Sequence, residues 1–84
     1  MNQSSALIHV SPALVVKDSC LHVKTSLPTF SDTEHCIKDE NDRIVRRGIV
    51  SERISAFSLS MVGIRTGVYH FIMGSAQQKF SVIL

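Results

Sequence analysis

The chain is poor in aromatic residues: its 84 residues include no tryptophan, one tyrosine and four phenylalanines. Proteins that bind single-stranded nucleic acid usually stack the bases on several aromatic side chains. The formal net charge is only +2, which is small for a protein that neutralises a phosphate backbone. A cluster of arginines at positions 43, 46, 47 and 53 would suit a phosphate, but solubilising charge on an exposed strand explains it as well. We therefore expect no nucleic-acid partner.

Segments that direct or anchor a protein in membranes are also lacking. No apolar run approaches the ~20 residues of a transmembrane helix, and residues 1–5 contain no basic residue ahead of an apolar segment, so they do not resemble a secretory signal peptide. As a whole protein, the chain is expected to stay in the cytoplasm. As a piece of a longer protein, it would follow that protein's destination.

Motifs of catalysis and cofactor binding are missing too. There is no Gly-x-Ser-x-Gly nucleophile turn and no glycine-rich phosphate loop. The acidic run at 39–42 lacks the calcium-loop pattern and favours a hairpin turn instead. The four histidines do not have zinc-ligand spacing, and histidines scattered over strands usually lie at the surface; they are His9, His22, His35 and His70. We expect no enzyme activity, no metal and no cofactor.

Two cysteines, Cys20 and Cys36, each fall in an expected strand. In an oxidising compartment a disulfide between them would stabilise the fold by about 3 kcal/mol. Free thiols in strands are also common. The sequence leaves both alternatives open.

What the chain does contain is a series of short apolar runs, spaced about 8 to 12 residues apart, with turn residues between them. This spacing is typical of an all-β sandwich or barrel, and no segment shows the 3.6-residue period of a helix. We predict one domain over residues 1–84, a small Ig-like antiparallel β-sandwich of about 6 to 8 short strands. Residues 1–9 would form a linker or leading strand. The expected strands cover residues 6–10, 13–16, 20–25, 35–38, 43–47, 57–61, 68–73 and 79–84, with loop at 27–33 and no clear preference at 48–53.

The last third carries the clearest strand pattern. Phe57, Leu59 and Met61 alternate with serines, as in a half-buried strand. Gly67 supplies the backbone freedom for a tight corner before the next strand. Residues 74–78 are expected to turn, so that the strands before and after them form a closing hairpin.

Four motifs in this order resemble the C-terminal sorting domains of the type IX (Por) secretion system of Bacteroidetes. Residues 10–12 and 17–23 resemble that family's opening pair of strands, and 37–45 its Asp-rich hairpin. Residues 59–69 are similar to its Leu…Gly-Val-Tyr segment, and 79–82 to its closing strand. The resemblance covers residues 10–84. Asp42 stands where the family has glycine, and aspartate tolerates the left-handed conformation needed there.

The resemblance implies a non-catalytic secretion signal that directs a fused cargo to the cell surface. Its partners would be the outer-membrane translocon and a sortase-like protease. Strand edges and the closing hairpin would be the recognition surface, because an exposed terminal strand offers unpaired backbone groups to a partner. The recognition residues implied are Gly67, Val68, Tyr69, Lys79, Asp39 and Arg43.

Other interpretations remain. The chain would look much the same as an Ig-like interaction or spacer module, or as a small orphan or viral β-protein that forms homodimers by pairing edge strands. Its last three residues, Val82-Ile83-Leu84, also fit a peptide that adds a strand to a PDZ-type groove.

Overall fold

The computed structural model describes residues 8–25 and 31–84 and has an all-β fold, as the sequence predicts. The strands are β1 (Ile8–Ser11), β2 (Leu14–Val16), β3 (Cys20–Thr25), β4 (Thr33–Lys38), β5 (Ile44–Val50), β6 (Ala56–Ser60), β7 (Gly67–Met73) and β8 (Ala76–Ile83). The described segments contain no helix, and hence none that could span a membrane.

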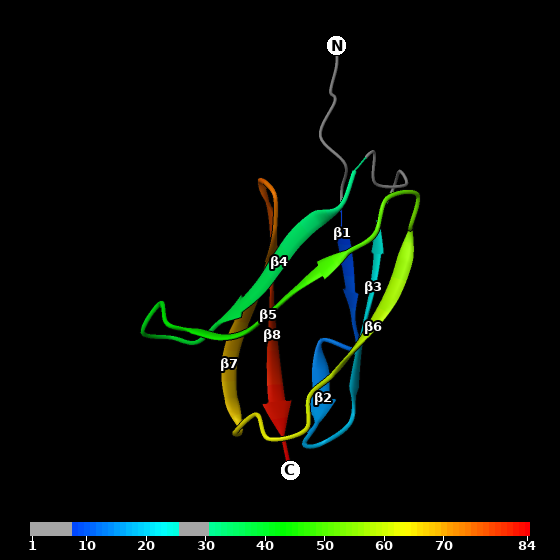
Figure 1. The fold of residues 1–84 in the computed structure, drawn as a ribbon. Helices are drawn as coiled ribbons and strands as arrows, with labels where there is room; N and C mark the ends of the chain where they lie inside the picture. Colours follow the sequence, from blue (N-terminus) through cyan, green and yellow to red (C-terminus); the bar gives the residue numbers. More distant parts are fainter. Residues whose placement is uncertain (1–7, 26–30) are drawn as a thin grey trace.

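The strands form two facing sheets (Figure 1). One has three strands in the order β1-β3-β6, and the other has five in the order β2-β8-β7-β4-β5. Every pairing is antiparallel except that of β2 with β8, which is parallel. The chain leaves the first sheet for the second between β1 and β2, where Pro12 has no N–H with which to continue a ladder.

The core lies between the sheets and follows from the period of two along each strand. Leu21 and Val23 of β3 are buried while Cys20, His22 and Lys24 are exposed. Burying one large aliphatic or aromatic side chain contributes about 1.5 to 3 kcal/mol. The buried apolar residues are Val10, Val15, Leu21, Val23, Ile37, Val50, Met61, Ile64, Tyr69, Phe71, Met73, Phe80 and Val82.

Several expected boundaries were wrong. The closing turn is only Gly74-Ser75, and β8 begins at Ala76 rather than Lys79. Because Gln77 and Gln78 are polar, the sequence pattern indicated a turn at this part of the strand. In the fold Gln78 bonds both backbone groups of Val10, accepting from its N–H (3.0 Å) and donating to its carbonyl (3.1 Å). β5 also continues through the ambiguous segment to Val50, and β6 ends before Met61.

The first expected strand and the expected loop at 27–33 lie partly outside the described residues. β1 spans Ile8–Ser11, so the structure tests only residues 8–10 of the strand expected at 6–10. Thr33, the last residue of the expected loop, is already part of β4. Within the described residues, the strand expected at 6–10 is present from Ile8.

The terminal strand is not an exposed edge, contrary to the interpretation drawn from the resemblance. β8 lies between β2 and β7 and pairs with both. Its backbone groups are used on both sides at residues 81–83, where β2 pairs with it, whereas residues 76–80 pair with β7 alone. The C-terminal end of β8 is therefore closed to a partner that adds a strand.

The two cysteines are both free. Cys20 belongs to β3 and alternates with buried Leu21, whereas Cys36 belongs to β4 and alternates with buried Ile37. Their side chains therefore lie on the opposite outer surfaces of the two sheets, with the core between them. This geometry excludes the disulfide alternative within one folded chain.

Candidate recognition surface

The outer faces of the two sheets differ in character. The outer face of the three-stranded sheet is mainly polar, with His22 and Lys24 on β3 and Ser58 and Ser60 on β6. His22 Nδ1 and Ser58 Oγ lie 2.8 Å apart, within hydrogen-bonding distance. This is the ordinary solvent-facing pattern of an antiparallel sheet.

The outer face of the five-stranded sheet carries exposed apolar side chains at one end. Leu14 is 60% exposed, Val16 54% and Ile83 39%. Val16 lies opposite Ile83 in the parallel pairing of β2 with β8, and Leu14 lies one outward position along β2. We call these three residues the β2–β8 patch. Adjacent exposed apolar side chains of this kind often mark a binding surface.

The predicted recognition residues do not form one site. Val68 and Lys79 share the outer face of the five-stranded sheet, since Val68 pairs with Ser81 and His70 with Lys79. Val68 is half-buried and Lys79 is exposed. They are diagonal neighbours on adjacent strands, and either can contact a partner.

Tyr69 instead points into the core. It is only 6% exposed, its ring stacks on Phe80 with centroids 5.8 Å apart, and its hydroxyl donates to the carbonyl of Arg65 (2.7 Å). Burial raises the pKa of Tyr69, and the charge of Asp39 raises it further. Its role in the structure is packing.

Gly67 is where the chain enters β7, with φ of +153°, a conformation that side-chain-bearing residues rarely adopt. The connection that precedes it carries the chain from β6 in one sheet to β7 in the other. The sequence prediction that this corner needs glycine is confirmed.

Asp39 and Arg43 close the turn between β4 and β5. Asp39 Oδ1 accepts hydrogen bonds from the backbone N–H of Asn41 (2.9 Å) and of Arg43 (3.0 Å), and the Asp39 N–H donates to the Arg43 carbonyl (2.9 Å). Asp42 has φ of +63°, which confirms the left-handed conformation expected where the resembling family has glycine. The Asp39 carboxylate thus has a structural role, while the Arg43 side chain is exposed.

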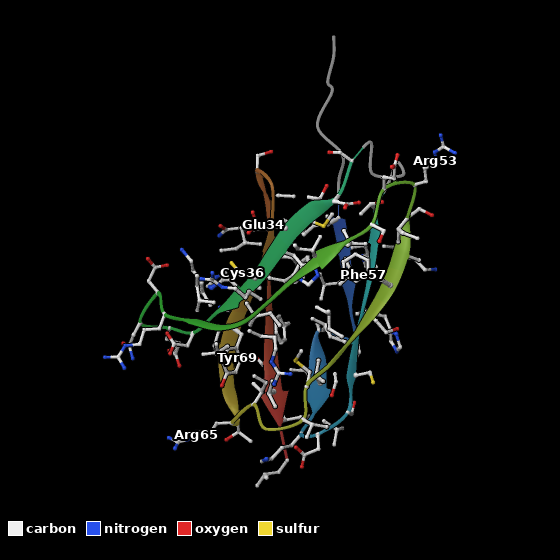
Figure 2. The ribbon with its side chains drawn as sticks, viewed as in Figure 1. Glu34, Cys36, Arg53, Phe57, Arg65 and Tyr69 are labelled. Carbon is white, nitrogen blue, oxygen red and sulfur yellow. The ribbon has the colours of Figure 1, made fainter. Side chains whose placement is uncertain are left out.

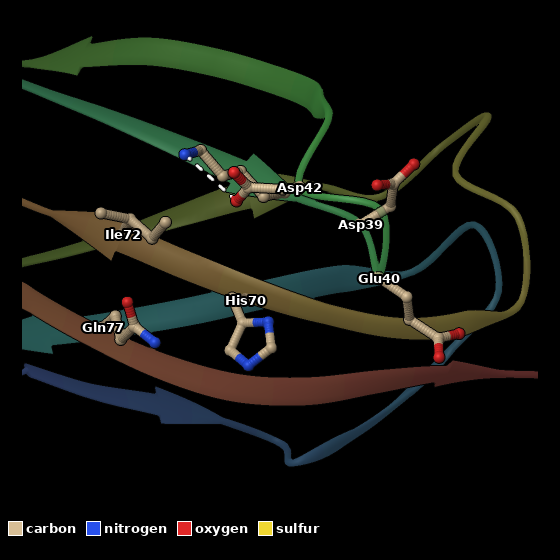
Figure 3. Close-up of a pocket in the computed structure, with 7 residues that line it drawn as sticks. Asp39, Glu40, Asp42, His70, Ile72 and Gln77 are labelled. Atoms are coloured by element: carbon tan, nitrogen blue, oxygen red, sulfur yellow. Dashed lines mark ion pairs between the residues drawn. The ribbon is translucent and has the colours of Figure 1, made fainter.

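A hollow of ≈ 200 Å³ lies at the base of this hairpin. Figure 3 shows the carboxylates of Asp39 and Glu40 pointing away from each other, while Asp42 faces Lys38 at 3.4 Å. Within the described segments no group of three or more histidine, cysteine or acidic side chains is arranged to hold a metal ion. The remaining lining residues are His70, Ile72 and Gln77.

His35 corrects the expectation that the strand histidines lie at the surface. It is 6% exposed, with its ring centroid 5.2 Å from that of Phe57 and 5.6 Å from that of Phe71. Burial lowers its pKa. Gly48, opposite His35 on β5, leaves room for the ring, because a Cβ there would lie 2.8 Å from His35 Cε1. The only sequence signal was that His35 shares a strand face with Ile37.

No protein-family model matches the chain, and no curated protein matches it. Among solved structures, it is similar to the crystal structure of a CARDB domain from Pyrococcus furiosus, determined in complex with di-metal ions. The identity is 15% and the TM-score 0.48, over 95% of this chain and 92% of that one. Two facing sheets and the core between them define the architecture. The chain is a small Ig-like β-sandwich domain.

Proposed function

We propose that this chain is a non-catalytic sorting domain, which directs a fused cargo through the type IX secretion machinery to the cell surface. The observation that carries the proposal is that two of the four motif segments, and the Gly-Val-Tyr end of a third, lie in or beside the five-stranded sheet. Residues 37–45 fall at the β4–β5 hairpin and 79–82 in β8, while 59–69 begins in β6 of the other sheet and ends at the start of β7. These parts of the motifs are scattered in the sequence but belong to one side of the sandwich.

The binding surface in this proposal is the outer face of that sheet. It presents the β2–β8 patch, Val68 and Lys79 to a partner, and the other sheet presents mostly polar groups. Removing three apolar side chains from water favours association, and Lys79 beside them adds a charged contact. The terminal strand itself, paired with β7 along its length and with β2 at residues 81–83, serves as the scaffold for this face.

The test is delivery of a reporter protein. Residues 1–84 are fused behind a signal peptide and a fluorescent protein, and expressed in a bacterium with a working type IX system. The proposal predicts that the reporter reaches the surface or medium, and that it stays in the periplasm of a strain lacking the translocon. A folded reporter that remains in the periplasm of both strains would contradict it, and would leave a binding or spacer module as the better account.

A further inference from the structure

β5 has the features of a binding edge. In the described part of the chain it pairs only with β4, so it is the last strand of the five-stranded sheet. An edge strand directs about half of its backbone N–H and C=O groups away from the sheet, where another strand can bond them. β5 spans seven residues, and Ile44, Val45 and Ile49 are 44%, 37% and 67% exposed. Protein edges are usually shorter or less apolar.

The charge of this edge is positive. Within the described residues the side-chain ion pairs join Lys17 to Asp18 and Lys38 to Asp42, so Arg43, Arg46 and Arg47 are not ion-paired there. Arg46 donates to two backbone carbonyls, that of Ser60 (3.3 Å) and that of Val62 (2.7 Å). Carbonyls hold the guanidinium in place but do not neutralise it. Edge protection would explain the arginines but not the exposed apolar residues between them.

A hollow of ≈ 340 Å³ joins β5 to the connection between β6 and β7. Val45 and Arg46 line it from β5, and Ile64 and Arg65 from the connection. Figure 2 shows the Arg65 side chain projecting outward beside the start of β7. The one acidic residue of the lining, Asp39, already accepts two backbone N–H groups of its own turn. The hollow can therefore receive a carboxylate between two arginines.

We propose that the β5 edge binds an extended segment of another protein that alternates acidic and apolar residues. The segment adds a sixth strand to the sheet through backbone hydrogen bonds. Its acidic side chains face Arg46 and Arg65 at the hollow, and its apolar side chains cover Ile44 and Ile49 on the outer face of the sheet. A second copy of the chain is a poorer occupant, because antiparallel pairing of β5 about its middle brings the Arg46-Arg47 pairs of the two copies together, and like charges across strands destabilise pairing.

The experiment uses the intact chain and a capped peptide of about eight residues with alternating Glu and Val, a length within the usual range of strands. Fluorescence anisotropy gives the dissociation constant, and hydrogen exchange followed by NMR locates the bound peptide. We expect binding that weakens as salt rises, with new protection of alternate amides in β5. A Lys-Val peptide should bind much more weakly, and so should a Glu-Val peptide with N-methylated backbone amides.

Charge reversal gives the matched comparison. Arg65→Glu, at the exposed arginine of the hollow, should weaken binding of the Glu-Val peptide about 10-fold, and Lys24→Glu, exposed on β3 in the other sheet, should leave it unchanged. If Arg65→Glu does not fold, Arg65→Gln, which removes the charge without reversing it, replaces it. Protection at another edge, equal binding of the Lys-Val peptide, or concentration-dependent dimerisation through β5 in sedimentation would each overturn the proposal. None of these readouts depends on secretion, so this test and that of the sorting function can fail separately.

Discussion

The buried imidazole of His35 is the residue with the most consequences for stability. It contributes a polar group to an otherwise apolar core, between Phe57 of one sheet and Phe71 of the other. The imidazole ring lies against Phe57, Phe71 and Gly48, and none of these residues can carry a charge. The neutral form is therefore favoured in the folded chain.

The first prediction is that stability falls in mild acid because of this residue. The folded-state pKa of His35 is lowered by burial, while its unfolded value is near 6.5. Below 6.5 the unfolded chain binds a proton that the folded chain does not, so the free energy of unfolding rises with pH there and levels off above it. The slope contributed is at most about 1.4 kcal/mol per pH unit. Urea unfolding across this range measures it.

The control is His35→Phe, which keeps an aromatic ring in the core and cannot titrate. The difference between wild type and this variant removes the contributions of the other histidines. An unchanged pH dependence in His35→Phe would contradict the assignment to His35.

The second prediction concerns Gly48. A Cβ at this position would lie 2.8 Å from His35 Cε1, so the ring must move. Gly48→Ala should lower the free energy of unfolding by about 1 to 3 kcal/mol, although alanine is usually better than glycine in a strand. In a His35→Ala background the same change should cost nothing. A penalty of equal size in both backgrounds would show that His35 is not the cause.

For single residues, the sequence predicted the backbone conformation more accurately than it predicted which side chains are buried. The left-handed position of Asp42 and the glycine at the 67 corner follow from local sterics, which act within a few residues. Whether His35 is inside depends on which residues face it from β5, β6 and β7. That information is distributed over the chain, and a single histidine in a strand does not reveal it.

Among the elements, the β4–β5 hairpin has a turn that is closed by hydrogen bonds to a single side chain. One carboxylate, that of Asp39, satisfies two backbone donors, and the turn sets the register of an edge strand that we propose to be functional. Turn and binding edge are therefore coupled, since a slip by one residue would move Arg47 and Ile49 to the other face.

The third prediction is that Asp39→Ala lowers the free energy of unfolding by about 1 to 2 kcal/mol, because two N–H groups lose their acceptor. The Glu40 side chain, at the next position of the same turn, accepts neither of these hydrogen bonds, so Glu40→Ala should change stability little. Chemical denaturation of the two variants makes the comparison. Equal losses would mean that the general charge of the turn matters, and not the hydrogen bonds of Asp39.

Element existence was predictable from alternation, but element boundaries were not. β8 begins early because Gln78 bonds the backbone of Val10 in the facing sheet, a contact between residues far apart in the sequence. The position of β8 between β2 and β7 was missed for the same kind of reason. Strand order follows from how all the apolar faces pack, and no local motif contains it.

The whole molecule is a two-layer sandwich with two chemically different outer faces. The polar face of the three-stranded sheet contrasts with the β2–β8 patch on the five-stranded one. Fold class was within reach of the sequence, because turn spacing and alternation are general properties of sandwiches. The recognition surface that we propose was not, since it combines Leu14 and Val16 with Ile83 from the opposite end of the chain.

The most direct test of this account is the export of the reporter fusion with one surface residue changed. Leu14 and Val62 are both 60% exposed, but Leu14 belongs to the β2–β8 patch and Val62 lies in the β6–β7 connection. The account predicts that Leu14→Gln reduces delivery to the surface about 10-fold or more while the domain stays folded, and that Val62→Gln leaves delivery unchanged. Normal delivery of a folded Leu14→Gln reporter, or equal losses in both variants, would contradict it.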